Sequence, residues 1–269
     1  MNAHAAALQA AGLDSGKAMG LAEGELSAEA VGPDAVAMEP LAKKSVWAPA
    51  SLEPADLRPL LARWGVPGTM ELVTVLGSFH FINRIADLVD VDADLPMVQR
   101  RWRWLRGAGV WLQARMMRLV VDLENRPADV DADALLDELV HLRGETLPAG
   151  YDAYRQAPSA VASLHCTTRS LPSFDSEMVA RVTAAVAAAL PADETESTGF
   201  HVRPDDPLDA LCFVGTRYVV RTTNEMVEAV RRRYGWNDAQ LTDLFYVISY
   251  RNAVERLDRL LAIVPAGGV

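Results

Sequence analysis

The segment at residues 70–91, MELVTVLGSFHFINRIADLVDV, carries the most regular pattern in the chain. Its apolar residues recur at steps of three and four, which places them on one face of an α-helix of about six turns. This face consists of Leu72, Val75, Leu76, Phe79, Ile82, Ala86 and Val89. Polar side chains are set into the centre of the same helix, namely His80, Asn83, Arg84 and Asp87. The pattern predicts a long amphipathic helix that holds both a core face and groups capable of chemistry.

A second copy of this pattern occurs at residues 242–263, TDLFYVISYRNAVERLDRLLAI. Placing Arg84 over Arg256 aligns the two segments without gaps. The flanks agree as well, because Arg63-Trp64-Gly65 precedes the first copy and Arg233-Tyr234-Gly235 precedes the second. Two copies of one supersecondary unit usually pack together. We therefore predict two repeats, each a short helix, a glycine turn and a long helix, that share one core.

The predicted helices are bounded by capping residues, glycine and proline. Ser51 begins the short helix of the first repeat, and Thr69 begins its long helix. Asp206 begins a later helix, and either Asn237 or Asp238 caps the last one. Alternating strand patterns are almost absent, so the predicted fold class is all-α.

The predicted organisation is an N-terminal arm followed by one domain. Residues 45–269 are expected to form an all-helical domain with repeats near 51–91 and 222–263, and with a further long helix over 96–124. Glycines interrupt the periodicity of residues 1–44. We therefore expect these residues to form a flexible or docking arm.

Composition excludes several classes of function. The 269 residues carry a formal net charge of −10, which argues against nucleic acid as a partner. The basic run at residues 99–106 is interpreted as a helix with solvated arginines and inward tryptophans. No apolar run approaches the roughly 20 residues of a membrane span, and no secretory signal pattern is present, so we expect a cytoplasmic protein. The scarcity of lysine beside abundant arginine indicates the codon bias of a bacterium rich in G and C.

The two cysteines, Cys166 and Cys212, do not form a CxxC pair, which argues against a disulfide framework or a cysteine metal site. No phosphate-binding loop, dinucleotide fingerprint or HExxH motif is present, so we expect no cofactor. A cluster of Asp205, Asp206, Asp209 and His201 could bind a divalent cation, but helix capping by Asp206 is the preferred interpretation. We therefore predict no metal site.

The stretches FHFINRIADLVDV and VISYRNAVERLDRLLAI resemble the helix of alkylhydroperoxidase D-like and carboxymuconolactone decarboxylase-like proteins. In that superfamily, a helix, a glycine turn and a helix with a central aromatic-Asn-Arg run form the recurring unit. The resemblance covers residues 51–91 and 206–263. It implies an alkylhydroperoxidase D-like helical bundle that assembles into homo-oligomers.

Peroxidase members of the superfamily place a CxxC pair and a histidine on the short helix before the glycine. The corresponding positions here hold Val219, Thr222 and Met226, and in the first repeat Pro49, Leu52 and Asp56. None is cysteine or histidine. Because a thiol peroxidase needs a thiolate of low pKa with a resolving partner, that activity is disfavoured here.

His80 is the first candidate for catalysis, because a histidine of ordinary pKa can transfer a proton near neutral pH. Arg84, one turn further on, could hold a carboxylate through two hydrogen bonds. The alternative is a core histidine beside an Arg84 that pairs with Asp87 or Glu71.

The second repeat places Asn252 and Arg256 at the positions of His80 and Arg84, with Tyr250 nearby. Two arginines that meet across a pseudo-two-fold axis would suit a carboxylate substrate, or would form structural salt bridges. The predicted substrate-binding residues are Asn83, Arg84, Tyr250, Asn252 and Arg256.

These observations lead to three functional hypotheses. The first is a cofactor-independent lyase or isomerase that decarboxylates, isomerises or cyclises a small organic acid or lactone, with His80 as the proton-transfer group. The second is a non-catalytic, oligomeric binding protein. The third is a hydroperoxide reductase that uses Cys212 or Cys166.

His165 and Cys166 are not expected to act as a base–nucleophile pair, because neighbours on a helix point about 100° apart.

Overall fold

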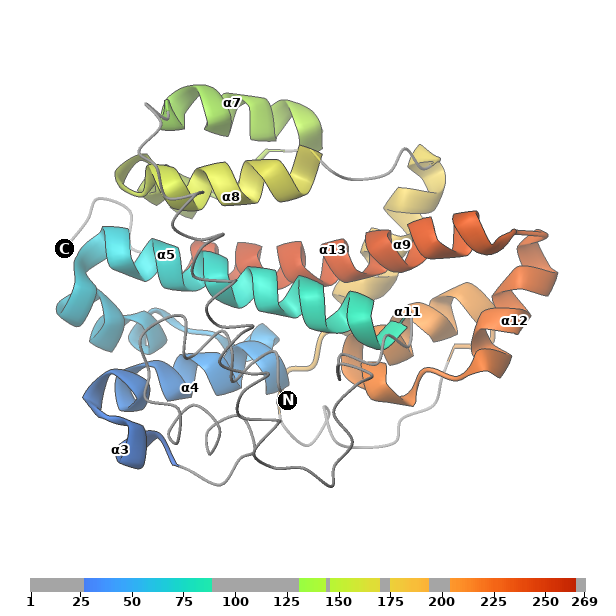
Figure 1. The fold of residues 1–269 in the computed structure, drawn as a ribbon, viewed down its shortest axis with the longest axis horizontal. Helices are drawn as coiled ribbons and strands as arrows, with labels where there is room; N and C mark the ends of the chain where they lie inside the picture. The colour runs from blue at the N-terminus through green and yellow to red at the C-terminus, as the bar shows by residue number, and fades with distance from the viewer. Residues whose placement is uncertain (1–26, 89–130, 144–145, 170–174, 194–203, 265–269) are drawn as a thin grey trace, which may run out of the picture. The chain divides into compact units, whose positions relative to one another are not determined.

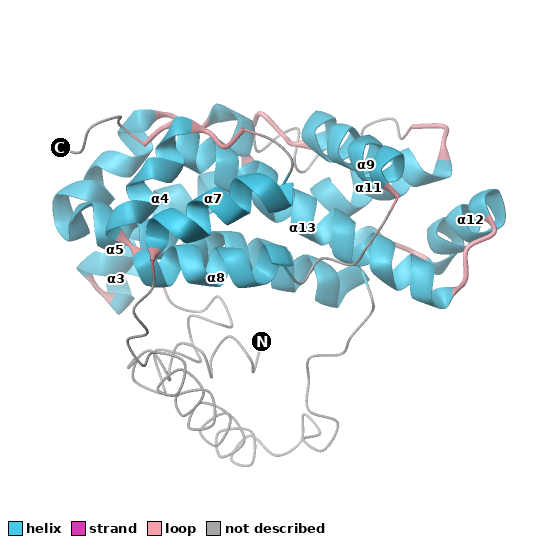
Figure 2. Cartoon of the chain, turned by 90° about the horizontal axis from the view of Figure 1, so that it is seen from above, coloured by secondary structure: helices cyan, strands magenta, loops and turns pink. Residues whose placement is uncertain are grey.

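The computed structural model describes residues 27–88, 131–143, 146–169, 175–193 and 204–264. All regular structure in these ranges is helical and none of it is strand, which confirms the predicted all-α class (Figure 2). The predicted helix over 96–124, its basic run, and residues 1–26 of the predicted arm lie outside the described residues. None of the described helices combines the length and the apolar character that a bilayer span requires.

The described chain is built from α-helices joined by loops and short 3₁₀ turns. The α-helices are α3 (Ala28–Val31), α4 (Pro33–Trp47), α5 (Pro54–Leu88), α7 (Ala132–Arg143), α8 (Pro158–Arg169), α9 (Ser176–Ala189), α11 (Pro207–Arg217), α12 (Asn224–Tyr234) and α13 (Asp238–Ala262). The short 3₁₀ helices are η1 (Pro49–Ser51), η2 (Ala149–Gln156) and η3 (Val219–Arg221).

Contacts divide the chain into two units, of which the larger comprises Pro40–Asp90 and Val130–Val269. In the smaller unit, the structure describes only α3 and the first turns of α4. The division falls inside α4 at Pro40, whereas the sequence placed the end of the arm at residue 44. The long helices and the candidate site residues belong to the larger unit.

The two longest helices, α5 and α13, lie side by side and run in opposite directions (Figure 1). Phe81 packs edge-on against Tyr246 with ring centroids 4.9 Å apart, and Gly77 faces Leu257 further along. A second apolar cluster joins α9, α11, α12 and α13 around Val186, Leu211 and Leu244. Helix α13 therefore contributes to the core on more than one side.

The apolar face predicted for residues 70–91 is not the face that α5 buries. Val75, Phe79 and Ile82 are exposed, whereas His80 and Arg84 are buried. Because the polar groups at the centre of α5 are directed into the molecule, the apolar residues beside them are turned outward. The helix was thus predicted correctly, but the side that it presents to the core was wrong.

A glycine with positive φ lies inside α5, and another lies just before α13. Gly65 has φ 64° and ψ −172° and kinks α5, whereas Gly235 has φ 69° and ψ 22° and ends α12. The prediction that Thr69 begins a helix is wrong, because α5 resumes directly after the kink and Thr69 donates its hydroxyl to the carbonyl of Gly65. Pro67 is tolerated in the first turn after the kink, because proline has no backbone N–H that would be left unpaired there. The prediction for the last helix is confirmed, because Asn237 forms a reciprocal capping box with Gln240.

Helices α7 and α8 pack together, and a partly buried network connects the end of α7 to η2 and α13. Arg143 donates to both carboxylate oxygens of Asp258, at 3.0 and 2.7 Å, and to the Tyr151 hydroxyl at 2.7 Å. The Tyr151 hydroxyl donates in turn to Asp258. Gly150 lies so close to α13 that an added Cβ would stand 1.8 Å from the carbonyl oxygen of Leu261. This position therefore accepts only glycine.

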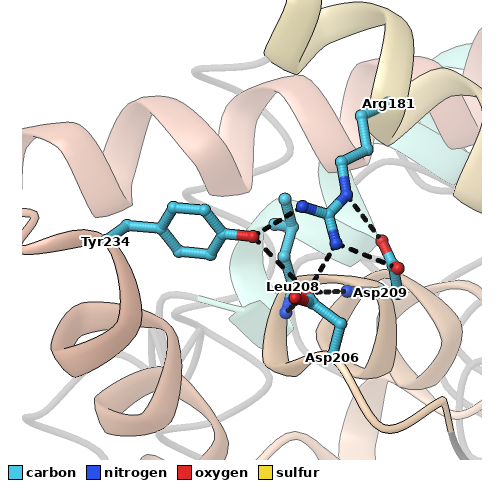
Figure 3. Close-up of polar contacts among 5 residues, drawn as sticks. All are labelled: Arg181, Asp206, Leu208, Asp209 and Tyr234. Atoms are coloured by element: carbon cyan, nitrogen blue, oxygen red, sulfur yellow. Dashed lines mark hydrogen bonds and ion pairs between the residues drawn. The ribbon is translucent and has the colours of Figure 1, made fainter.

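Helices α9 and α11 are joined by an ion-pair cluster around Arg181 (Figure 3). Its Nε and one terminal nitrogen donate to the two oxygens of Asp209, at 3.1 and 3.0 Å, and it lies 2.7 Å from Asp206. The Tyr234 hydroxyl accepts from Arg181 at 2.7 Å. Asp206 also accepts from the backbone N–H groups of Leu208 and Asp209, which confirms its predicted capping role.

Candidate functional site

Polar side chains meet in the core where α4, α5, α11 and α13 adjoin. We call this set the arginine centre, and all of its members are buried. The members are Ser45, His80, Arg84, Thr216, Asn252 and Arg256. The relative exposure is 8% for Arg84 and 1% for Arg256, so both guanidinium groups lie out of bulk water.

Each arginine is held first by its own helix, four residues after a polar partner. The Arg84 guanidinium donates to His80 Nδ1 and to the His80 carbonyl, both at 3.3 Å. The Arg256 guanidinium donates to Asn252 Oδ1 at 2.9 Å and to the Asn252 carbonyl at 3.5 Å. Residues four apart are neighbours on a helix surface, so this arrangement follows directly from the sequence spacing.

Each arginine also reaches a backbone carbonyl on a distant segment. Arg84 donates to the carbonyl of Thr216 at 3.3 Å, and Arg256 donates through Nε to the carbonyl of Ser45 at 3.1 Å. A second Arg256 nitrogen lies 3.5 Å from the Thr216 carbonyl. These carbonyls belong to the last turns of α11 and α4, where the helix offers them no partner and where a cation interacts favourably with the helix dipole. The arginines therefore stabilise the ends of two helices.

The charge of the centre is not balanced by an ion-paired carboxylate within the described residues. Asp87 is near enough to act on Arg84 through its charge, but neither Asp87 nor Glu71 forms an ion pair with it there. Burial lowers the pKa of Arg84 to about 10, and burial together with Arg84 lowers the pKa of Arg256. Arg84 Nε is buried and has no hydrogen-bond partner in the described part of the chain. A small anion would supply both an acceptor and a compensating charge.

The contacts of His80 define its neutral tautomer. Because a guanidinium can only donate, Nδ1 accepts from Arg84 and the ring proton must sit on Nε2. The Nε2–H group then donates to Ser45 Oγ, 3.3 Å away, and Ser45 Oγ donates to the carbonyl of Ala42 at 2.8 Å. Burial, followed by the charges of Arg256 and Arg84, holds the pKa of His80 well below its usual value. His80 is therefore uncharged at neutral pH.

The structure brings together His80, Arg84, Asn252 and Arg256 out of the predicted site residues. The side chain of Asn83 is exposed and lies outside the arginine centre. Tyr250 is buried on another side of α13, where its hydroxyl donates to Thr168 at 3.0 Å. Tyr250 lines a separate cavity of about 30 Å³ between α5, α8 and α13, which is large enough only for about one water molecule.

Ser45 and Thr216 belong to the centre but were not predicted. Both accept from the arginines through backbone carbonyls, and a backbone carbonyl leaves no signature in the sequence. The Thr216 hydroxyl has a further role, since it accepts from the Asn252 amide at 3.1 Å and donates to the carbonyl of Cys212. This chain of bonds fixes the orientation of Asn252.

The thiols offer weaker chemistry. Cys212 is fully buried, and burial raises the pKa of its thiol, which opposes formation of the thiolate that a peroxidase requires. Cys166 is exposed on α8, and its neighbour His165 is directed to Glu138, with Nε2 and the carboxylate 2.9 Å apart. The hydroperoxide reductase hypothesis gains no support from either environment.

The acidic cluster near residue 206 is used structurally. Asp206 caps α11, and both Asp206 and Asp209 pair with Arg181 (Figure 3), whereas His201 lies outside the described residues. Within the described ranges, no group of three or more His, Cys, Asp or Glu side chains is arranged to hold a metal ion.

Comparisons of the chain with protein-family models, with curated proteins and with solved structures found no match. The chemistry of the arginine centre is therefore the basis on which a function can be argued.

Proposed function

We propose that the protein is a cytoplasmic bacterial enzyme of the alkylhydroperoxidase D-like fold that lacks the redox cysteine pair. It binds a small organic acid or lactone at the arginine centre and acts by acid–base chemistry without a cofactor. The reaction is a decarboxylation, an isomerisation or a cyclisation. The protein forms a homo-oligomer.

The observation that carries this proposal is the pair of buried guanidinium groups without an ion-paired carboxylate among the described residues. Burying a charge costs several kcal/mol unless it is paired. A carboxylate accepts two hydrogen bonds from a guanidinium in a fixed geometry. Arg84 Nε, buried and unbonded in the described residues, is the donor available for this contact.

His80 is placed to transfer a proton once the acid is bound. In the present arrangement, Arg84 donates to His80 Nδ1 and so blocks the one ring nitrogen able to accept a proton. A carboxylate that draws the guanidinium toward itself releases Nδ1. The negative charge of the ligand also raises the pKa of His80, because it offsets the charges of Arg84 and Arg256. Substrate binding therefore activates the base.

Backbone conformation supports the proposed origin of the fold in two repeats. Ala48 before η1 has φ −143° and ψ 49°, and Tyr218 before η3 has φ −143° and ψ 51°. Leu52 and Thr222 after these turns also agree, with φ and ψ of −62° and 137° against −64° and 131°. The positive-φ glycines Gly65 and Gly235 follow at the same separation in the chain.

The test is a thermal-shift screen of small carboxylic acids, beginning with sodium acetate, at neutral pH. At a ligand concentration a hundredfold above Kd, binding stabilises the native state by about 2.7 kcal/mol, which raises Tm on the order of 5 °C. Arg84→Met should abolish the shift. Arg181→Met is the matched control, since this arginine is paired with two carboxylates and should leave the shift unchanged. Equal shifts in wild type and Arg84→Met would contradict the proposal.

The role of His80 requires a separate measurement with an acid that is turned over. His80→Ala should retain binding of that acid but lose catalysis by a factor on the order of 10² or more. Turnover that persists unchanged in His80→Ala would remove His80 from the mechanism.

The second candidate function is a non-catalytic oligomeric binding protein. It is favoured by an apolar stripe on α5, where Val75, Phe79 and Ile82 are 48%, 40% and 57% exposed at helical spacing. A second copy of the chain would cover this stripe. Sedimentation of Ile82→Glu against wild type tests the contact, since a charge there should shift an oligomer toward the monomer.

A further inference from the structure

Ser45 presents two oxygen atoms to the donors of the arginine centre. Its carbonyl accepts from Arg256 Nε at 3.1 Å, and its hydroxyl accepts from His80 Nε2 at 3.3 Å. Ser45 is fully buried in the last turn of α4. Ser45 thus occupies donors of Arg256 and His80, two members of the arginine centre in which the proposed function places the organic acid.

This pair of acceptors matches a carboxylate in hydrogen bonding but not in charge. A carboxylate also offers two oxygens, and its hydrogen bonds with a guanidinium are roughly twice as strong as bonds between neutral groups. The Ser45 oxygens satisfy the donors as dipoles and leave the two positive charges unneutralised. A carboxylate is therefore the stronger acceptor at the same donors.

The turn that carries Ser45 is held by buried side chains and by an ion pair at its edge. Leu41 is fully buried, and Lys44 pairs with Asp56 at 2.8 Å in a partly exposed ion pair. Pro40 lies inside α4 and has no N–H, so the helix lacks its bond to the Val36 carbonyl at this point. The division of the chain into contact units also falls there, with residues 40–47 in the larger unit. Residues 40–47 are thus marked off from the preceding part of the helix.

We propose that residues 40–47 form an internal plug, in which the two oxygens of Ser45 stand in for the carboxylate of the ligand. The organic acid enters the arginine centre by displacing this turn. The inference rests on the proposed function and adds to it how the buried site opens and which ligand atoms replace which protein atoms.

The experiment is a calorimetric titration of the full chain with sodium acetate, in wild type and in Ser45→Ala. The variant loses the hydroxyl that competes for His80 Nε2, so acetate should bind roughly three- to tenfold more tightly. Lys44→Gln is a second variant that leaves the core intact. It weakens only the attachment of the plug and should tighten binding by about twofold.

Ser78→Ala is the matched control, because Ser78 also donates its hydroxyl to a backbone carbonyl of its own helix, at Thr74, but lies outside the arginine centre. It should leave acetate affinity unchanged. Hydrogen exchange provides the second readout, in which saturating acetate should accelerate exchange of the peptide over residues 40–47.

The outcomes separate the two proposals. If acetate binds wild type and Ser45→Ala equally and exchange over 40–47 does not increase, the plug is refuted while anion binding stands. If acetate binds neither protein, the plug and the proposed function fail together.

Discussion

Helices α5 and α13 carry the same arrangement with one chemical difference. Each places an arginine four residues after a polar side chain, as His80–Arg84 on α5 and Asn252–Arg256 on α13. Arg256 uses all three of its nitrogens in hydrogen bonds, whereas Arg84 Nε bonds to none of the described residues. Asparagine cannot titrate and histidine can. The α13 side thus has all of its guanidinium nitrogens bonded, whereas the α5 side keeps a titratable group and a donor that bonds to none of the described residues.

The first way to break this comparison is to remove each arginine in turn. Arg256→Met should lower the free energy of unfolding by about 3 kcal/mol, since it leaves the Ser45 carbonyl and Asn252 Oδ1 buried without donors. Arg84→Met should cost about 1 kcal/mol, because the Thr216 carbonyl keeps a donor in Arg256. Urea denaturation at pH 7 measures both. Equal costs, or a larger cost for Arg84→Met, would show that the two sides do not differ as described.

The second test sharpens the comparison at the glycines that introduce the two helices. Gly65 occupies a region of φ and ψ that is essentially restricted to glycine, while Gly235 is in the left-handed region that other residues enter at smaller cost. An added Cβ would make only an ordinary van der Waals contact at Gly65 and none at Gly235. The cost of each substitution is therefore set by backbone strain. Gly65→Ala should cost about 2 kcal/mol and Gly235→Ala about 1 kcal/mol. Thermal unfolding of both variants measures the two losses of stability. A larger loss for Gly235→Ala than for Gly65→Ala would contradict this prediction.

The smallest effect concerns pH. The lowered pKa of His80 means that the unfolded chain takes up a proton below about pH 6.5 while the folded chain does not. The stability that this residue contributes is therefore present above pH 6.5 and is lost as pH falls, at no more than about 1.4 kcal/mol per pH unit. His80→Asn copies the α13 arrangement and should flatten the profile between about pH 7 and 5.5 by about 1 kcal/mol. The exposed His141→Asn variant is the control. A His80→Asn profile parallel to wild type would disprove the assignment.

The parts of the fold that sequence predicted correctly are those that local chemistry determines. The capping box at Asn237 and the cap at Asp206 depend on side chains next to the helix that they begin. Both glycine positions were found because positive φ favours glycine, but only Gly235 ends a helix as predicted, whereas Gly65 kinks α5 without ending it. Thr69 was misjudged since the chain kinks at Gly65 without leaving the helix, which makes a second cap unnecessary.

The candidate site was predicted only where side chains four apart share a helix face. This spacing brought together His80 with Arg84 and Asn252 with Arg256. Asn83 is separated from Arg84 by about 100° around the helix, and Tyr250 lies about 200° from Asn252, so neither shares the face. Ser45 and Thr216 contribute backbone carbonyls to the arginines, and every residue has a carbonyl. Only the tertiary fold determines which one is used.

Each arginine of the centre bonds to a carbonyl in the other part of the sequence, and this has a consequence for the chain as a whole. Arg84 lies in the first part of the sequence and binds a carbonyl of the second, while Arg256 lies in the second part and binds a carbonyl of the first. If the chain were cut between α7 and η2, each fragment would hold a guanidinium with one of its acceptors on the other fragment. Neither fragment can form these two bonds by itself, whereas the two together recover both of them. The centre thus ties the two parts of the chain to each other through a pair of reciprocal bonds.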